Sequence, residues 1–234
     1  MDNLLQNYHL LLSKVDSWLK NLDSTLAPHM HCCPGCSECC KNFTVFPVEA
    51  YSMLKYIKDQ KIDVSQIKKS CNWDCKDEKH QNENKENLCV PNESRDSFCI
   101  FLNDKGLCRI YPARPLICRT HGYPILVKSY PENRAGSTEN KIDYCPKNFQ
   151  DRILTQDYLK REHLIDVDHL NTLLFSINSL FIKQCRQLIV NKESNSLNLL
   201  HLFCNISDNV EKVEDAGRVG NGRLSFYDII STSI

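Results

Sequence analysis

The chain has 234 residues, which is enough for one sizeable hydrophobic core, and its 29 basic and 29 acidic side chains leave no net charge. This balance gives no indication of a nucleic-acid partner, and no apolar run approaches the roughly 20 residues that a membrane-spanning helix needs. The seven glycines form none of the glycine-rich loops that bind nucleotides. We therefore expect no nucleic-acid partner, no membrane partner and no nucleotide-binding loop.

The helices of the N-terminal third can be located from apolar periodicity. Over residues 2–26 apolar side chains recur at i, i+3 or i+4, and i+7, which predicts a long amphipathic helix. Residues 43–46 form a short apolar run that fits a strand or a turn. Residues 64–70 fit a further short helix, and Pro47 suits the first turn of a helix whose buried face is formed by Val48, Ala50, Tyr51, Leu54 and Ile57.

The middle of the chain is predicted to contain the β-structure. Residues 72–96 are strongly polar, as is typical of a solvated insertion. Residues 98–111 hold two apolar runs on either side of a turn that contains Gly106, which predicts a β-hairpin. Residues 123–127 fit a third short strand, and residues 129–141 have the composition of a loop.

The C-terminal region, residues 149–216, is predicted to be helical. One segment is expected around residues 153–159, and Asp168 fits the N-cap of the longest helix. A further helix is expected over 196–204, and residues 217–234 are expected to form a partly flexible tail.

These elements predict an α+β fold that is predominantly α-helical. We expect a single domain over residues 1–234, in which amphipathic helices surround a cysteine-rich loop and a small β-hairpin. The cysteine-rich part, residues 32–146, would form a metal-binding module. The N-terminal helix and the C-terminal helical region would pack on it.

The 14 cysteines are the main chemical signal in the chain. The N-terminus lacks a signal peptide, so a cytoplasmic protein is expected. In a reducing compartment cysteines serve as metal ligands or as small buried apolar residues rather than in disulfides. Disulfides stay the alternative if the chain is exported by a non-standard route.

The densest cysteine cluster lies at residues 32–40, where the spacing C-x2-C-x2-C-C begins at Cys33. A C-x-x-C step brings two sulfurs onto one metal, and Pro34 and Gly35 favour the necessary turn. The candidate ligands fall into two sets of four, each sufficient for a zinc ion or an iron–sulfur cluster: Cys33, Cys36, Cys39 and Cys40, and then Cys99, Cys108, Cys118 and Cys145. Ligands from both sets could also interleave.

Adjacent cysteines bear on the number of centres. Neighbouring side chains in extended backbone point to opposite faces, so Cys39 and Cys40 do not easily bind one tetrahedral ion. Either they serve two metals, or one of them packs as a small apolar residue. The same choice applies to Cys32 and Cys33, and the sequence leaves one centre and two centres equally open.

Cations near the cysteines could offset the charge of a thiolate site. Four thiolates on a divalent ion give a net charge of about −2, as do four thiolates on a four-iron cluster with a dipositive core. Arg114 and Arg119 lie between predicted ligands and could donate hydrogen bonds to the sulfurs. An ordinary basic surface is the alternative. His121 could be a ligand or a proton donor, although a hydrogen-bonded loop histidine is the simpler interpretation.

Together these motifs resemble the CxxCxxCC cysteine-cluster family, which is described as a zinc- or iron-chelating domain. The resemblance rests on the first cysteine run, on Val45-x2-Val48-Glu49-Ala50, and on later matching segments over roughly residues 32–146: Cys99-x-Phe101-Leu102, Gly106-x-Cys108-x-Ile110-Tyr111, Arg114-Pro115-x2-Cys118-Arg119 and Cys145-Pro146. It implies that the eight cysteines of the two sets are the metal ligands. The insertion at 71–97 and the extra Cys32 depart from the simplest form of the pattern.

Three functions are consistent with this resemblance. The first is a metal-binding protein that holds zinc or an iron–sulfur cluster in a structural, carrier or redox role. The second is an iron–sulfur enzyme of the flagellin N-methylase type, which would transfer a methyl group from S-adenosylmethionine; Cys32-x3-Cys36-x2-Cys39 has a matching cluster spacing. The third is a scaffold for a protein partner that zinc holds together. The scarcity of acid–base groups near the cysteines favours binding over catalysis.

Overall fold

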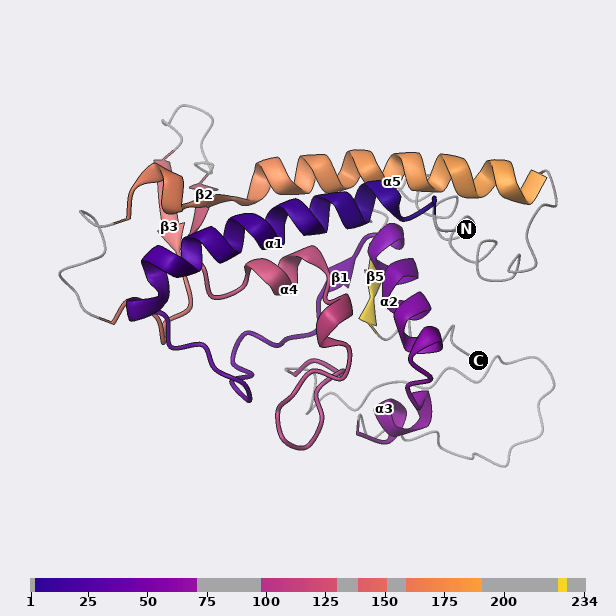
Figure 1. Ribbon diagram of the computed structural model, residues 1–234, viewed down its shortest axis with the longest axis horizontal. Helices are drawn as coiled ribbons and strands as arrows, with labels where there is room; N and C mark the ends of the chain where they lie inside the picture. The colour runs from indigo at the N-terminus through magenta and orange to yellow at the C-terminus, as the bar shows by residue number, and fades with distance from the viewer. Residues whose placement is uncertain (1–2, 71–97, 130–138, 151–158, 191–222, 227–234) are drawn as a thin grey trace.

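The computed structural model describes residues 3–70, 98–129, 139–150, 159–190 and 223–226. Its fold is α+β and predominantly helical, as predicted. The long helices α1 (Gln6–Leu26) and α5 (Val167–Val190) lie side by side, and α2 (Pro47–Asp59) starts beside them and runs away from them at a steep angle (Figure 1). The cysteine-bearing loops lie on the side of α1 away from α5 (Figure 1).

Helix α1 forms because its apolar side chains repeat at helical spacing. It buries one stripe, made of Tyr8, Leu11, Leu12, Val15, Leu19, Leu22 and Leu26. The predicted helix is confirmed, except that residues 3–5 form a turn before it. The helix passes into a 3-10 turn, η1 (Ala27–His29), where Pro28 is placed early in the turn.

Helix α2 begins at Pro47, as predicted, and its first turn is anchored from two directions. The backbone N–H of Phe46 donates to Glu49 Oε2 at 3.0 Å, which caps the helix. The backbone N–H of Val48 donates to Asn178 Oδ1 of α5 at 3.1 Å. The next helix, α3 (Val64–Ser70), is also where the sequence predicts it. The bond between Val48 and Asn178 holds the start of α2 against α5.

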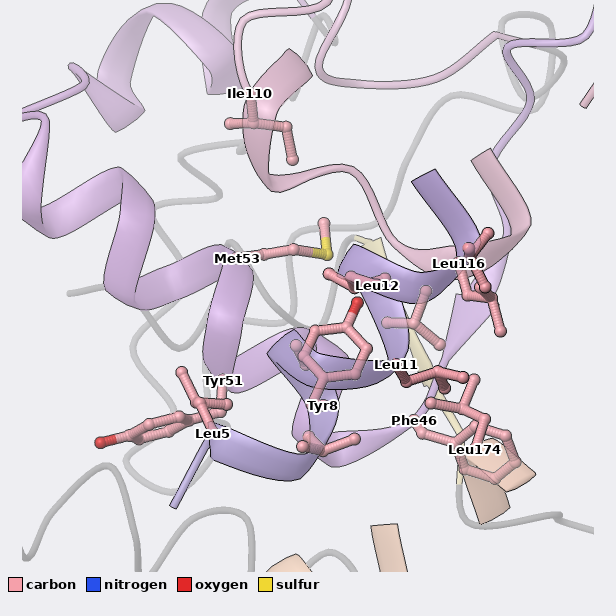
Figure 2. Packing of buried hydrophobic residues seen from close by; sticks show 14 of the residues in the cluster. Leu5, Tyr8, Leu11, Leu12, Phe46, Tyr51, Met53, Ile110, Leu116 and Leu174 are labelled. Atoms are coloured by element: carbon pink, nitrogen blue, oxygen red, sulfur yellow. The ribbon is translucent and has the colours of Figure 1, made fainter. Parts of the chain in front are cut away.

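The side chains between the helices form one continuous core. Figure 2 shows Tyr8 and Leu12 of α1 facing Met53 of α2, while Leu11 lies near Phe46 and Leu174. Burying such side chains stabilises the fold by about 1.5–3 kcal/mol each. None of the described helices is both long and apolar enough to cross a membrane.

Two small sheets complete the described fold. In the first, β2 (Ile125–Ser129) lies between antiparallel β3 (Glu139–Asp143) and parallel β4 (Ile165–Asp166). The strand predicted at 123–127 is thus confirmed with a shift of two residues. Strand β3 corrects the predicted loop at 129–141, because residues 139–141 pair with β2.

The second sheet pairs segments that are distant in sequence. Strand β1 (Thr44–Val45) lies antiparallel to β5 (Leu224–Ser225), so the strand alternative for residues 43–46 is confirmed. Strand β5 and Phe226 belong to the segment expected to form a partly flexible tail, of which the structure describes residues 223–226. Phe226 is buried there, with its ring centroid 5.2 Å from that of Phe101.

The predicted hairpin at 98–111 is reduced to a turn with one bridge, between Leu102 and Cys108. The first arm coils because the N–H of Leu102 bonds back to the carbonyl of Cys99 at 3.1 Å. The side chain of Asn103 holds the turn by accepting from the N–H groups of Lys105 and Leu107. The second arm ends in a 3-10 turn, η3 (Tyr111–Ala113), which contains Pro112.

The C-terminal region also differs from its prediction. Residues 149–150 are not helical, and Phe149 has a positive φ of 52°. Residues 161–163 form a 3-10 turn, η4 (Arg161–His163), which precedes β4. The N-cap of α5 is Asp166 rather than Asp168, because Asp166 Oδ1 accepts from the N–H of His169 at 3.0 Å.

Several predictions fall outside the described residues. These are the polar insertion at 72–96, the helical segment at 153–159 except for residue 159, the helix at 196–204, and most of the tail. Cys71, Cys75, Cys89 and Cys204 also lie there.

Candidate metal centre

A single cavity of about 490 Å³ brings cysteines from four parts of the chain together. Its wall includes the first cysteine run, the turn around residue 108, the start of the short helix α4 (Leu116–Thr120), and Cys145. The thiols that line it are Cys32, Cys33, Cys36, Cys39, Cys40, Cys108, Cys118 and Cys145. All of them are free thiols, as are Cys99 and Cys185.

Two tight turns form one side of this cavity. In the first, the N–H of Cys36 donates to the carbonyl of Cys33 at 3.0 Å. Gly35 and Gly106 both have positive φ, at 91° and 72°. A Cβ on Gly106 would lie 2.9 Å from the Gly35 carbonyl oxygen, so the turns pack backbone to backbone. Glycine at these positions lets the 33–36 turn meet the 103–106 turn.

Cys99 joins the cluster through the backbone. Its N–H donates to the carbonyl of Cys40 at 3.0 Å, and the next N–H, of Ile100, donates to Asn42 Oδ1 at 3.3 Å. The segment that carries Cys99 therefore lies against the end of the first cysteine run.

Cys40 and Cys118 each interact electrostatically with Cys99 and Cys108, and Cys40 also interacts with Cys118. We call these four residues the inner thiols. Burial raises the pKa of Cys118, and the neighbouring charges of Cys99 and Cys108 raise it further. A hydrogen bond from Cys39 lowers the pKa of Cys40, against burial and the charges of Cys99, Cys118 and Cys108. Cys40, Cys108 and Cys118 also line the cavity, and the segment that carries Cys99 lies against Cys40.

Cys32 interacts electrostatically with Cys36, Cys39 and Cys145, and we call these four residues the outer thiols. Burial raises the pKa of Cys32, a hydrogen bond with Asn148 opposes this, and the charges of Cys145, Cys39 and Cys36 add to the rise. The hydrogen bond to Cys40 raises the pKa of Cys39, together with burial, and links the two groups. By these interactions each group includes thiols from both predicted sets, which favours the interleaved alternative.

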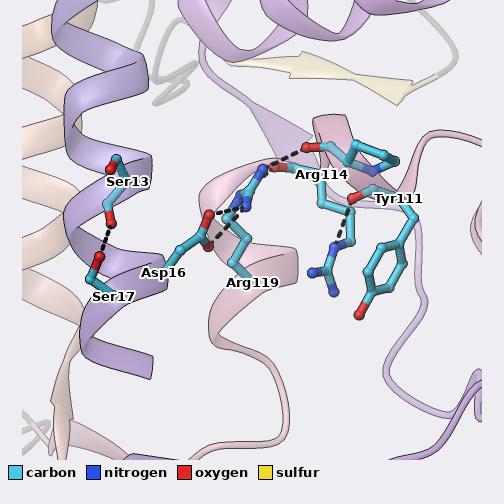
Figure 3. Close-up of polar contacts among 7 residues, drawn as sticks. Ser13, Asp16, Ser17, Tyr111, Arg114 and Arg119 are labelled. Carbon is cyan, nitrogen blue, oxygen red and sulfur yellow. Dashed lines mark hydrogen bonds and ion pairs between the residues drawn. The ribbon is translucent and has the colours of Figure 1, made fainter. Parts of the chain in front are cut away.

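The two arginines have different surroundings. Arg114 lines the cavity, and its charge acts to lower the pKa of Cys39, Cys108 and Cys118. Arg119 places its guanidinium elsewhere: Nη1 donates to both carboxylate oxygens of Asp16, and Nη2 donates to the carbonyl of Pro112 (Figure 3). Its Nε donates to the carbonyl of Arg114 at 2.9 Å. Arg119 thus contacts Arg114 rather than the sulfurs.

His121 lines the same cavity and packs against Phe43, with ring centroids 4.9 Å apart. Burial lowers the pKa of His121, which favours the neutral imidazole. It contributes an aromatic wall to the cavity.

The donor chemistry fits zinc or iron, because both metals take thiolate ligands. Within the described residues, no three His, Cys, Asp or Glu side chains are already arranged to hold a metal ion. The thiols instead surround a shared space. Metal binding would require the sulfurs to close inward across the cavity.

Two buried polar residues near the thiols were not identified as site residues from the sequence. Glu49 is 3% exposed, and its carboxylate caps both α2, at Phe46, and α4, at Leu116, where Oε1 accepts from the N–H at 2.9 Å. Asn148 is 1% exposed and bonds to Cys32. Asn148 follows Cys145 by three residues, a spacing that suits a turn, and this was the available signal.

Comparison with known proteins identifies the family. A family model named CxxCxxCC, described as “Putative zinc- or iron-chelating domain”, matches residues 31–148, just over half of the chain. The chain belongs to the CxxCxxCC family. The matched residues begin just before the first cysteine run and end at Asn148, so they span both thiol groups. No curated protein and no solved structure matches the chain significantly.

Membership in the CxxCxxCC family agrees with the thiol cavity at the level of chelation. The family description gives zinc or iron, and the cavity supplies thiol donors suited to both.

Proposed function

We propose that this protein holds zinc or an iron–sulfur cluster through up to eight cysteine thiolates, in a structural, carrier or redox role. The observation that supports this proposal is the convergence of thiols from separate segments on one cavity. Seven of the proposed ligands are Cys36, Cys39, Cys40, Cys99, Cys108, Cys118 and Cys145. The eighth sulfur comes from Cys32 or Cys33.

Two centres fit the thiols better than one. The inner and outer thiols each supply the four sulfurs of a tetrahedral zinc site or a four-iron cluster. Cys39 and Cys40 fall in different groups, as expected for adjacent residues that serve two centres. In this arrangement Arg114 would offset part of the charge of about −2 that four thiolates and a dipositive metal centre carry together.

The fold positions the segments that carry the proposed ligands. The two glycine turns present the first cysteine run, α4 presents Cys118, and Glu49 fixes the start of α4. A bound metal would supply cross-links between these segments, or a redox couple if it is an iron–sulfur cluster. The thiol protons must leave when metal binds, because the metal ligand is the thiolate.

Metal and acid-labile sulfide analysis of anaerobically purified protein tests this proposal. Iron with sulfide in near-equal amounts and a brown absorption spectrum would identify a cluster, and zinc without colour would identify a zinc site. Protein that carries neither metal after expression in metal-replete medium, and that takes up neither when both are added, would overturn the proposal.

A second candidate is an iron–sulfur enzyme of the flagellin N-methylase type. The observation in its favour is a second cavity of about 490 Å³, which shares Cys32, Arg114 and His121 with the thiol cavity. Such a cavity would place a small polar substrate beside the outer thiols. Calorimetry of cluster-loaded protein with S-adenosylmethionine tests this function, and absence of binding would exclude it.

A further inference from the structure

We propose that Cys32, and not Cys33, supplies the fourth sulfur of the outer thiol group, and that Asn148 holds Cys32 in position. This inference rests on the proposed function, since it concerns the ligands of the proposed centre. It departs from the motif spacing, in which Cys33 opens the C-x2-C-x2-C-C run.

The structure provides a site for the Cys32 sulfur. Asn148 Nδ2 lies 3.5 Å from Cys32 Sγ and donates to the carbonyl of Gly122 at 2.8 Å, while Asn148 Oδ1 accepts from the N–H of His31 at 2.7 Å. The amide is therefore fixed on both sides by backbone groups. Because Asn148 is 1% exposed, water does not compete strongly for these bonds.

Gly122 leaves the space that this sulfur occupies. Its φ is 93°, and a Cβ at this position would lie 2.9 Å from Cys32 Sγ. A side chain on residue 122 would thus displace the sulfur from Asn148. Together Gly122 and Asn148 form a cradle for one thiol.

The same cradle is tied to a second outer thiol. The N–H of Asn148 donates to the carbonyl of Cys145 at 2.8 Å, so one turn presents both Cys145 and the amide that contacts Cys32. Cys32 also lines the thiol cavity together with Cys36, Cys39 and Cys145, the other three outer thiols. These contacts place Cys32 within the group that would share a metal.

Cys33 has no equivalent contacts. Both thiols are exposed, but within the described residues the Cys33 sulfur has no hydrogen-bond partner, whereas Cys32 contacts Asn148. Cys33 stabilises the turn through its backbone carbonyl, which accepts from the N–H of Cys36 at 3.0 Å. Since neighbouring side chains point in different directions, only one of Cys32 and Cys33 reaches the outer thiols readily.

The amide of Asn148 suits a metal-bound thiolate. An N–H donor toward the sulfur stabilises the thiolate form and fixes its direction, as ligand-supporting residues do in metal sites. Asn148→Asp would keep an acceptor for the N–H of His31 but would place a carboxylate beside the sulfur. We expect this change to weaken metal loading of the outer thiols about 10-fold.

Alkylation mapping of the metal-loaded wild-type protein tests the ligand choice directly. With iodoacetamide and mass spectrometry, Cys33 should be modified while Cys32 is protected, and both should react after a chelator removes the metal. This experiment does not depend on whether a variant folds. Modification of Cys32 with protection of Cys33, or equal protection of both, in metal-loaded protein would overturn the inference and leave the proposed function standing.

Variants provide a second, independent test. Cys32→Ser should lower the metal-to-protein ratio by about half while Cys33→Ser retains the wild-type ratio, if each group of four thiols binds separately. Asn148→Asp should load more weakly, with Lys141→Gln, at an exposed position of β3, as the control. Wild-type loading in both Cys32→Ser and Asn148→Asp would contradict the inference. Wild-type protein without any metal would instead overturn the proposed function.

Discussion

Arg114 is the cation that acts most broadly on the thiols. Its guanidinium lies over the ring of Tyr111, 3.5 Å from the centroid, and its Nε donates to the Tyr111 carbonyl at 3.0 Å. These contacts hold a positive charge at the wall of the cavity. Through that charge Arg114 acts to lower the pKa of Cys39, Cys108 and Cys118, which favours the thiolate forms that bind metal.

We predict that Arg114→Gln weakens metal affinity about 3- to 10-fold, because removing one partly buried charge costs about 1 kcal/mol. Arg114→Lys should recover most of the loss, since it keeps the charge. Competition with a chromogenic chelator measures the effect. Lys105→Gln, on the exposed turn nearby, is the control, and an equal loss in that variant would show that the effect is non-specific.

Adjacent cysteines show how far residue-scale prediction could go. From the sequence, Cys39 and Cys40 are expected either to serve two metals or to differ in packing. In the structure Cys40 interacts with the inner thiols, whereas Cys39 interacts with Cys40 and Cys32. The sequence could not distinguish Cys32 from Cys33, because that difference arises from Asn148 and Gly122, which are about 90 to 116 residues away in the chain. Contacts over such separations leave no local periodicity.

At the scale of elements, Glu49 connects two helices that position the site. One carboxylate oxygen caps α2 and the other caps α4, and Tyr8 of α1 also hydrogen-bonds to this carboxylate. Burial raises the pKa of Glu49, and the hydrogen bonds from Leu116 and Phe46 oppose that rise. The helix that carries Cys118 is therefore fixed to α1 and α2 through one side chain.

We predict that Glu49→Gln lowers the free energy of unfolding by about 1–3 kcal/mol, because its amide NH₂ would face a backbone N–H donor. Tyr8→Phe removes one donor and should cost only about 1 kcal/mol. Urea unfolding followed by circular dichroism measures both. Equal stability of Glu49→Gln and wild type would contradict the capping role.

The Asp16–Arg119 ion pair is a second connection between elements. Arg119 on α4 is 9% exposed, whereas Asp16 on α1 is 50% exposed, and the closest N···O distance is 2.7 Å (Figure 3). Because Arg119 also holds the carbonyl of Arg114, this pair orients the segment between η3 and α4.

We predict that Asp16→Asn destabilises the protein by about 1–2 kcal/mol, less than a fully buried pair would because Asp16 is half-exposed. The exposed Lys55–Asp59 pair, at 2.9 Å, provides the matched control. Asp59→Asn should cost less than about 0.5 kcal/mol in the same urea experiment. Similar losses in the two variants would contradict a special role for Asp16.

The elements differ in how well the sequence predicts them. Helices α1 and α2 follow from local periodicity and from Pro47, and both are confirmed. The hairpin fails because Asn103 and a backbone turn take the N–H groups that a ladder would need. The β1–β5 pairing could not be predicted, since its strands are two residues each and lie far apart in the chain.

At the scale of the whole molecule, the thiols couple stability to pH. Burial raises the pKa of Cys108 and Cys118 in the folded state, and burial or hydrogen bonding does the same for Cys32 and Cys39. An unfolded chain releases these protons at lower pH than the folded chain does. The metal-free protein therefore loses stability as pH rises through the ordinary thiol pKa, about 8.5. The lowered pKa of Cys40, set first by its hydrogen bond from Cys39, acts in the opposite direction.

Metal binding opposes this loss of stability at high pH. Binding displaces thiol protons, so it becomes stronger as pH rises. We predict that the difference in melting temperature between metal-loaded and metal-free protein widens from about pH 6 to about pH 9. Thermal melts with and without a chelator across this range measure it. A difference that stays constant or narrows would contradict thiolate ligation.

The metal content of Cys118→Ser shows whether thiols from distant segments bind a shared metal. Cys118 belongs to the inner thiols, whereas Cys185 is buried in α5 outside both groups and provides the control as Cys185→Ala. After anaerobic purification we predict that Cys118→Ser loses the metal of the inner group while Cys185→Ala keeps the wild-type metal-to-protein ratio. The wild-type ratio in Cys118→Ser would contradict the account.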